Sequence, residues 1–391
     1  MADFSSAQRV HTYCALCIAR CGAVVVIENG RFIGLEPDPG HPTGQALCAK
    51  GRAAPELVYH PERLTRPLRR TRPKGDPDPG WEPIGWDAAL DQTAAAIRRA
   101  VERHGPQAVA FTLSSPSTTA IGDSSGFIHR LANALGTPNA AITLDVCGWG
   151  RGFATRYTYG VGSVAVGGGG AMPDIGNSGC MILWGYNPSY TRITHATAVI
   201  EALKRGMRLI VIDPRHVGLA SKADLWLRVR PGTDGALALG IANLMIERGW
   251  YDRDFIRDWS NGPLLVRTDT GRLLTEKDLT AAGDARCTFA WDSAAARPVA
   301  YDTATGRYDG SNLALEGEYL VVTARGEVVC HPAFELYTRL CRRYPPEAVE
   351  AICWIPRAQV EEAASLIWHS RPVGQSFRSA RRAATSRAPF A

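Results

Sequence analysis

The first regular feature of the chain is a compact apolar run at residues 23–27, followed by Asn29-Gly30 and a second apolar stretch at residues 31–35. An Asn-Gly pair between two apolar runs is a strong signal for a tight β-hairpin, because both residues accept positive φ angles. We therefore expect an antiparallel hairpin here, and short strands across residues 1–62.

From residue 86 onward, stretches with a helical spacing of apolar residues alternate with short, continuously apolar runs. This alternation predicts βαβ units and a largely parallel, doubly wound sheet. The fold class is therefore α/β, with a small β-rich domain in front, and residues 140–260 are typical of a nucleotide-binding domain. The expected strands are 108–111, 181–184, 208–212 and 225–229, and the expected helices are 87–104, 125–135, 194–205 and 234–248.

Changes in composition divide the chain further. A proline-rich stretch at residues 67–83 predicts a surface connection, and Asp87 or a neighbour caps the helix that follows. Charged turns and short strand patterns at 265–330 indicate an irregular or β-rich insertion, and an amphipathic helix is expected at 357–369. The predicted parts are a domain at 1–62, an α/β domain at 63–140 completed by 340–374, an α/β domain at 141–339, and a tail at 375–391.

Composition and charge exclude several classes of protein. No run approaches the ~20 apolar residues of a membrane-spanning helix. The net charge of +6 is mild, and no basic run interleaved with aromatic residues precedes the C-terminal end, so nucleic-acid binding is not expected. Ten cysteines in 391 residues do not form a disulfide-scaffold pattern. Unpaired thiols favour a reducing compartment, and we expect a cytoplasmic protein.

Four of the cysteines form the strongest chemical motif. Cys14, Cys17, Cys21 and Cys48 have the spacing C-x2-C-x3-C-x26-C, three on one short loop and a fourth remote from it. This spacing favours a [4Fe–4S] cluster, which needs four thiolates at the corners of a small polyhedron. A structural zinc site is the alternative, although zinc more often uses two C-x2-C pairs. Unrelated buried cysteines are the third possibility.

Three predicted strands end in residues suited to a nucleotide-type ligand, because ligands of doubly wound sheets sit beyond the carboxyl ends of the strands. Each ending taken alone is typical of a plain turn, and Asp234 alone is typical of a helix N-cap. The sequence has neither G-x-G-x-x-G after the first strand nor a P-loop. The six residues are Gly185, Asn187, Asp213, Arg215, Gly232 and Asp234.

Cys147 stands apart from the cysteine motif. It follows a strand-like run at a turn and precedes Gly148. An isolated cysteine in such a place is more often a buried core residue than a ligand.

Taken in order, these motifs resemble the molybdopterin oxidoreductases of the dimethyl-sulfoxide-reductase superfamily. The resemblance covers about residues 10–374. It is carried by the cysteine motif with Cys48-Ala49-Lys50-Gly51, and by YHPERLTRP, WDAAL, WGYNP, IDPR and PGTDGAL, which begin at residues 59, 86, 184, 212 and 231.

The resemblance implies a [4Fe–4S] cluster beside a molybdenum or tungsten ion held by two molybdopterin guanine dinucleotides (bis-molybdopterin guanine dinucleotide). Lys50 matches the family's basic residue between cluster and pterin, and Cys147 lies near the position of the protein ligand to the metal. The six strand-end residues match cofactor-contact positions, which makes 141–339 a pterin-dinucleotide-binding domain. Soft thiolate ligation suits such a metal.

The implied function is an oxidoreductase catalytic subunit that transfers an oxygen atom or a hydride equivalent at the metal. It implies a small-molecule substrate and an electron-transfer partner, such as a ferredoxin-like iron–sulfur protein. Gly148 stands where formate dehydrogenases have histidine, which disfavours formate. Ile18 stands where the family's acetylene hydratase has aspartate, so a non-redox hydratase is a lower-ranked alternative.

Length is a further departure, because members of the family continue beyond residue 374 into another domain. We therefore expect a truncated chain whose residues from Gln375 onward form an aberrant or disordered tail. A non-catalytic, cluster-binding fragment is the second alternative to a full oxidoreductase.

Overall fold

The computed structural model describes residues 7–17, 19–113, 125–142, 154, 156–158, 174–302, 305–310 and 312–375. The chain divides into two compact units. The first comprises Met1–Asn177, Asn187–Gly206 and Gly374–Ala391, and the second comprises Ser178–Tyr186 and Met207–Val373.

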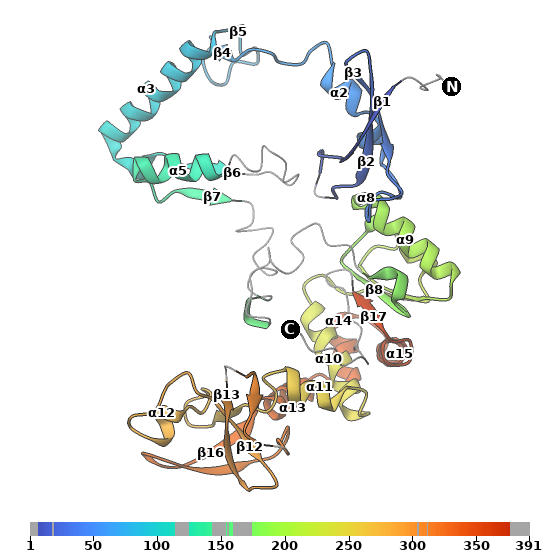
Figure 1. Cartoon of the computed structure of the whole chain (residues 1–391), viewed down its shortest axis with the longest axis vertical. Helices are drawn as coiled ribbons and strands as arrows, with labels where there is room; N and C mark the ends of the chain where they lie inside the picture. The colour runs from blue at the N-terminus through green and yellow to red at the C-terminus, as the bar shows by residue number, and fades with distance from the viewer. Residues whose placement is uncertain are drawn as a thin grey trace. The chain divides into compact units, whose positions relative to one another are not determined.

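The first unit begins with a three-stranded antiparallel sheet in the order β1-β2-β3, drawn in blue in Figure 1. The predicted hairpin is confirmed, because Asn29 and Gly30 have φ angles of 49° and 75° in the turn between β2 and β3. β1 lies among the short strands expected across residues 1–62, but its bounds were not predicted, since its mixture of polar and apolar residues has no strong period. The strands are β1 (Gln8–Tyr13), β2 (Gly22–Glu28) and β3 (Arg31–Pro37).

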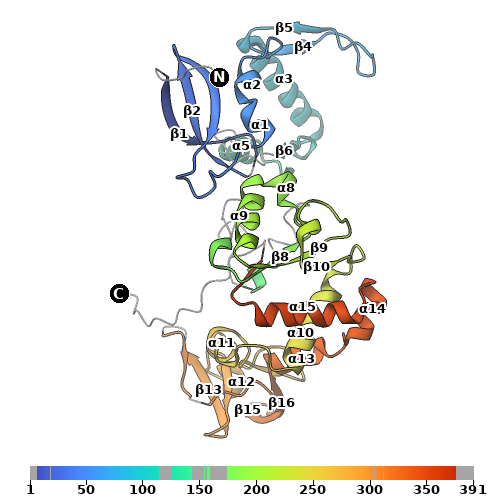
Figure 2. The ribbon, with the colours of Figure 1, turned by 90° about the vertical axis from the view of Figure 1, so that its right-hand side faces the viewer.

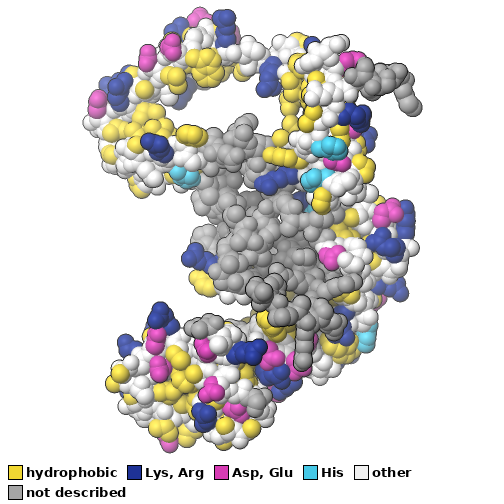
Figure 3. Space-filling model, viewed as in Figure 1, with side chains coloured by type: hydrophobic (Ala, Val, Ile, Leu, Met, Phe, Trp, Pro, Cys, Tyr) yellow, Lys and Arg dark blue, Asp and Glu magenta, His cyan; other side chains and the backbone are white. Residues whose placement is uncertain are grey.

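Two short helices, a small hairpin and one long helix follow. α3 spans Trp86–His104 as predicted, but its N-cap is Gly85 rather than Asp87, which lies inside the first turn. Its apolar stripe is exposed among the described residues, with Leu90 62% accessible, and Figure 3 shows hydrophobic side chains along this helix. The other elements here are α1 (Ala49–Arg52), α2 (Ala54–Val58), β4 (Leu68–Arg70) and β5 (Trp81–Pro83).

The strand expected at 108–111 forms later than predicted. Residues Pro106–Ala108 form a 3-10 turn (η1), because Pro106 lacks the N–H that a strand would use. β6 therefore starts at Phe111 and runs to Leu113, and it pairs in parallel with β7 (Ala140–Ile142). α5 (Ser125–Leu135) connects the two strands, as predicted.

A four-stranded sheet in the order β10-β9-β8-β17 forms the centre of the second unit. The pairs β8–β9 and β9–β10 are parallel, which confirms the predicted α/β fold. Their side chains are almost wholly buried, as expected for strands covered on both faces. The strands are β8 (Cys180–Trp184), β9 (Arg208–Ile212), β10 (Leu225–Leu227) and β17 (Val373–Gln375).

After β8 come α8 (Pro188–Thr191) and α9 (Ile193–Lys204), and the 3-10 turn η3 (Gly218–Lys222) separates β9 from β10. The helix predicted between β8 and β9 is confirmed as α9, whereas α8 and the 3-10 turn η3 were not predicted. β10 is two residues shorter than predicted. Among the described residues, the structure has no helix long and apolar enough to cross a bilayer.

Three helices pack together in the second unit, as Figure 2 shows for α10, α14 and α15. This finding corrects the prediction that 340–374 completes the 63–140 domain. The apolar side chains of α14 and α15 instead share one core with β9, β10 and α10, and β17 pairs with β8. The bounds are α10 (Asp234–Glu247), α13 (Ala333–Cys341), α14 (Pro346–Cys353) and α15 (Arg357–His369), of which α13 and α14 were not predicted.

The segment between α10 and α13 is β-rich, as predicted for residues 265–330. It contains two antiparallel three-stranded sheets, ordered β11-β16-β15 and β12-β13-β14. Figure 1 shows this segment in orange. Its elements are α11 (Arg253–Trp259), β11 (Leu265–Arg267), α12 (Glu276–Leu279), β12 (Phe289–Asp292), β13 (Arg297–Asp302), β14 (Arg307–Tyr308), β15 (Tyr319–Thr323) and β16 (Gly326–Pro332).

Close contact between α10 and α14 leads to a stability prediction. A Cβ atom on Gly240 would lie 2.2 Å from Cγ2 of the fully buried Val349. We expect Gly240→Ala to destabilise the second unit, because overpacking costs about 1–3 kcal/mol and outweighs the ~1 kcal/mol that alanine gains over glycine in a helix. The measurement is the urea midpoint of unfolding.

Gly235→Ala is the matched control in the same helix, since nothing lies within 4 Å of its added Cβ atom. We expect this variant to match or exceed the wild type in stability. Equal midpoints for the two variants would contradict the tight α10–α14 packing.

Candidate functional site

The loop between β1 and β2 brings three cysteines together, and the start of α1 adds the fourth. The backbone N–H of Cys14 donates to the carbonyl of Cys21 at 2.8 Å, which closes the loop, and Cys48 is the N-cap of α1. Cys14 and Cys21 are buried, whereas Cys17 and Cys48 are half-buried. All four thiols line one cavity of about 50 Å³.

A short turn after β3 supports this loop. The Thr43 hydroxyl donates to the Arg20 carbonyl at 2.9 Å and accepts from the Gly22 N–H at 3.1 Å. The turn is so tight that a Cβ atom on Gly44 would lie 1.7 Å from the Asp38 carbonyl oxygen. The loop is therefore held by contacts from residues more than twenty positions away, which fixes where its thiols lie.

Burial dominates the electrostatics of the thiols. Burial, and after it the neighbouring thiols Cys14, Cys17 and Cys48, raise the pKa of Cys21 to about 11. Burial also raises the pKa of Cys14, whereas the Lys50 ammonium acts in the opposite direction. A set of four thiolates in this cavity therefore needs positive charge beside it.

The four cysteines fit a polynuclear cluster. Among the described residues, no three His, Cys, Asp or Glu side chains converge closely enough to hold a single metal ion. The four thiols line one shared cavity, and four cysteine thiolates are the ligand set of a [4Fe–4S] cluster. Gly51 also lines the cavity, and a Cβ atom there would contact the Cys14 sulfur at 3.5 Å.

α8 and the first residue of α9 supply a wall of the cysteine cavity that was not predicted from the sequence. Ser189, Tyr190, Thr191 and Ile193 line it together with the cysteines and Lys50. These residues follow directly on the WGYNP motif, whose Asn187 is the N-cap of α8. Their position after that motif was the only available signal, because none of the four has distinctive chemistry by itself.

Parallel pairing places the ends of β8, β9 and β10 at one edge of the sheet. Gly185 follows β8 with a φ angle of 57°, and its N–H donates to the Ile212 carbonyl at 2.8 Å. Nothing lies within 4 Å of a Cβ atom added there, so the backbone is open to a ligand. Asp213 follows β9, and its carboxylate accepts from the Arg215 N–H at 2.8 Å.

Two tryptophans connect these strand ends. The Trp184 indole N–H donates to Oδ1 of Asp234 at 2.7 Å, joining the end of β8 to the start of α10. The Trp226 indole N–H donates to the Asp213 carbonyl at 2.9 Å. Neither tryptophan was predicted as a site residue, although Trp184 belongs to the WGYNP motif.

The start of α10 corrects the N-cap interpretation of Asp234. Thr233 is the N-cap, and Asp234 is the first residue of the helix. Gly232 precedes them with a φ angle of 84°, a conformation that glycine adopts without strain. The Asp234 side chain is exposed and held in place by Trp184, so its carboxylate is oriented and accessible.

Asn187 has an unsatisfied polar atom within the described residues. Its side-chain oxygen is buried without a hydrogen-bond partner there, while its backbone carbonyl accepts from the N–H of Thr191. A buried acceptor of this kind fits a site that a polar ligand completes. Asn187 belongs to the first unit, whereas the other strand-end residues belong to the second.

Of the remaining predicted site residues, the structure describes Arg215 and Lys50 but not Cys147. Arg215 is exposed, with its guanidinium available to solvent, and Lys50 is exposed at the edge of the cysteine cavity. Cys147, predicted as the ligand of the metal, lies outside the described residues, as do Gly148 and Ile18.

Two protein-family models match the chain. Residues 7–60 match the molybdopterin oxidoreductase Fe4S4 domain, and residues 63–343 match molybdopterin oxidoreductase. The first match contains all four cysteines, and the second contains all the predicted strand-end residues.

Curated relatives show the same family. The chain is 30% identical to the perchlorate reductase subunit alpha of Dechloromonas aromatica, over 87% of this chain and 39% of that protein. It is 31% identical to the acetylene hydratase of Syntrophotalea acetylenica, over 66% of this chain and 34% of that protein. The chain thus spans less than half the length of these relatives.

A solved structure agrees in fold. Acetylene hydratase from Pelobacter acetylenicus superposes with a TM-score of 0.63 at 23% sequence identity, covering 94% of this chain and 40% of that one. These family matches imply a [4Fe–4S] cluster and a molybdopterin that carries molybdenum or tungsten. By the extent of these matches, the chain belongs to the molybdopterin oxidoreductase family.

Proposed function

We propose that this chain is part of the catalytic subunit of a molybdenum- or tungsten-dependent oxidoreductase. The observation that carries the proposal is the convergence of four thiols on one cavity in a chain whose parallel sheet presents polar residues at successive strand ends. The bound metal and its pterins supply oxygen-atom or hydride chemistry.

In this proposal, Cys14, Cys17, Cys21 and Cys48 hold a [4Fe–4S] cluster. Lys50 lines the same cavity, and its ammonium favours the ionised thiol of Cys14. Its role is to stabilise negative charge on the cluster side of the site and to donate hydrogen bonds toward the pterin.

The strand-end residues hold the guanine dinucleotides. The carboxylates of Asp213 and Asp234 suit guanine N–H groups or ribose hydroxyls, and Arg215 suits phosphate. The glycines at 185 and 232 leave room for the ligand to approach the backbone, and the buried Asn187 oxygen accepts a hydrogen bond. Cys147, on sequence grounds alone, is the protein ligand of the metal.

The same proposal extends to partners and compartment. Electrons enter or leave through the cluster, so we infer an electron-transfer partner such as an iron–sulfur protein, and a small-molecule substrate. The cysteines that the structure describes are all free thiols, which suits the reducing cytoplasm.

Non-redox hydration is the second candidate, because acetylene hydratase is among the relatives. Turnover in the absence of any electron acceptor distinguishes it from the oxidoreductase. A non-catalytic, cluster-binding fragment is the third, and the content of molybdenum or tungsten after anaerobic purification distinguishes it from both.

The first prediction concerns the cluster. We expect Cys48→Ser to lose most of the iron, about four per chain in the wild type, because a hydroxyl is a poor substitute for a thiolate ligand. Iron analysis and the visible absorption of the cluster are the measurements. Cys287→Ser is the matched control, since Cys287 lies in the β-rich segment, and equal iron in the two variants would contradict the assignment.

The second prediction concerns guanine recognition. We expect guanosine, but not adenosine, to raise the melting temperature of the wild-type chain, since a ligand stabilises the state that it binds. Asp234→Asn keeps an oxygen for the Trp184 indole but loses the negative charge. It should therefore fold normally and lose the guanosine effect.

Asp254→Asn is the control for this experiment, because it removes one exposed carboxylate on α11. An undiminished guanosine effect in Asp234→Asn would show that its carboxylate does not bind guanine.

The third prediction concerns Cys147. Cys147→Ser should reduce the content or change the spectrum of molybdenum or tungsten while leaving the iron content intact, because the two metals have separate ligands. Unchanged metal retention and spectra would overturn the ligand assignment.

A further inference from the structure

The β-rich segment of the second unit contains an open cavity of about 940 Å³ that plays no part in the proposed function. Its wall is formed by the end of β11, the loop that follows it, α12, the loop between α12 and β12, and the turn between β15 and β16. Every residue that lines it lies between Arg267 and Arg325, so the cavity belongs to one continuous part of the fold.

Positive charge predominates on this wall. Four cationic side chains line the cavity, against a single carboxylate, that of Asp278. The four are Arg267, Arg272, Lys277 and Arg325.

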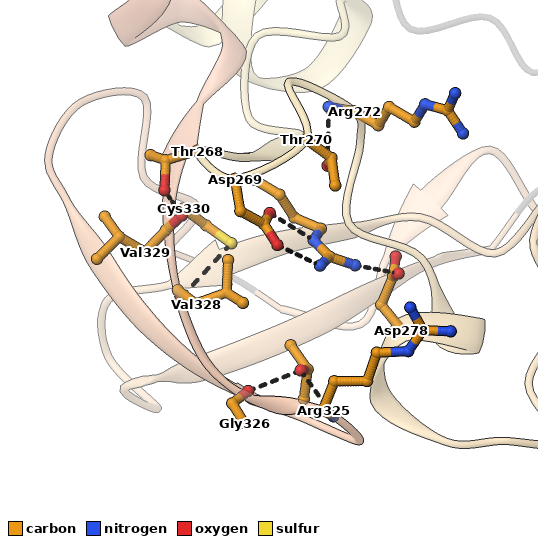
Figure 4. Close-up of polar contacts among 12 residues, drawn as sticks. Thr268, Asp269, Thr270, Arg272, Asp278, Arg325, Gly326, Val328, Val329 and Cys330 are labelled. Carbon is orange, nitrogen blue, oxygen red and sulfur yellow. Dashed lines mark hydrogen bonds and ion pairs between the residues drawn. The ribbon is translucent and has the colours of Figure 1, made fainter.

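The carboxylate is fully engaged. Asp278 accepts from the N–H of Thr275 at 2.9 Å and from its hydroxyl at 2.8 Å, and it pairs with Arg267. Arg267 also forms two hydrogen bonds to Asp269, at 3.0 and 2.6 Å. Figure 4 shows Asp269 and Asp278 in this network. The positive charge of Arg267 is thus balanced by two carboxylates. The negative charge of Asp278 is balanced in turn by Arg267, so it repels an anion only weakly.

The other three cations differ from Arg267. Arg272, Lys277 and Arg325 are exposed, and no ion pair or side-chain hydrogen bond holds any of them among the described residues. Three unpaired cations around a concave wall create a positive potential that attracts anions. The lining also includes the threonines at 270, 288 and 323, whose hydroxyls are of the kind that bind phosphate oxygens.

We propose that this cavity binds a small molecule bearing a diphosphate group. Arginine and lysine together with hydroxyls are the side chains that recognise phosphate oxygens. The cavity has the size of sites that enclose nucleotide-sized molecules. A concave wall favours such a ligand over an acidic protein surface. The elements that form this cavity are different from the strand ends that we propose to bind the guanine dinucleotides.

Binding of inorganic pyrophosphate to the purified chain tests the proposal by calorimetry at physiological salt. The triple variant Arg272→Gln, Lys277→Gln and Arg325→Gln should bind roughly tenfold or more weakly, because hydrogen bonds from charged donors are the strong ones. The matched control is Arg286→Gln, Arg297→Gln and Arg307→Gln. It removes the same charge from the same segment outside the cavity wall, and should bind within about twofold of the wild type.

Binding of adenosine diphosphate and of adenosine distinguishes a site for the diphosphate group alone from a site for a whole nucleotide. Equal binding of pyrophosphate and adenosine diphosphate, with none of adenosine, indicates recognition of the diphosphate alone, whereas tighter binding of adenosine diphosphate indicates a nucleotide. Absence of pyrophosphate binding to the wild type, or an equal loss in both triple variants, overturns the proposal. Loss in Asp234→Asn but not in the cavity variant also overturns it.

A measurement on the wild-type chain guards against misfolding of the variants. Pyrophosphate should slow acetylation of Lys277 by an activated ester, while leaving acetylation of the exposed Lys74 in the first unit unchanged. Equal rates for Lys277 with and without pyrophosphate overturn the proposal. Protection of Lys277 by an acidic peptide but not by pyrophosphate assigns the cavity to a protein partner instead.

Discussion

Parallel pairing of β8, β9 and β10 is the constraint on which the second unit depends. Parallel strands all end at the same edge, so three turns far apart in sequence must lie next to one another. The buried apolar side chains of the strands make this pairing stable, and they leave the polar residues of the turns at the surface. Chemistry at the edge is therefore a consequence of the hydrophobic core beneath it.

Local signals in the sequence predicted much of this architecture. The turn at Asn29-Gly30 and the helix at 357–369 required only short-range patterns, and the strand-end residues followed from where apolar runs stop. Long-range partners could not be predicted in this way. The Trp184–Asp234 hydrogen bond joins residues fifty positions apart, and the packing of α14 on α10 depends on the missing side chain of Gly240. The strand expected at 108–111 failed because a proline displaced it.

The cysteine cavity and the WGYNP motif show how one segment serves two purposes. Its first residues end β8 in the second unit, and its last residues lead into α8, which lines the cavity of the cysteines in the first unit. The apolar run that predicts the end of β8 gives no sign that the following residues line the cysteine cavity, because that second role arises from tertiary packing. The convergence of Cys14, Cys17 and Cys21 was predictable because their spacing is local, whereas the α8 wall was not.

The Trp184–Asp234 hydrogen bond has a spectroscopic consequence. The fluorescence emission of an indole whose N–H donates to a carboxylate depends on the charge and polarity around that carboxylate. Trp184 is such an indole, and it is only partly buried. A ligand that engages Asp234 must change this environment directly. The chain therefore carries an intrinsic fluorophore at the edge of its sheet, and the difference in emission between the wild type and Trp184→Phe isolates that signal from the other nine tryptophans.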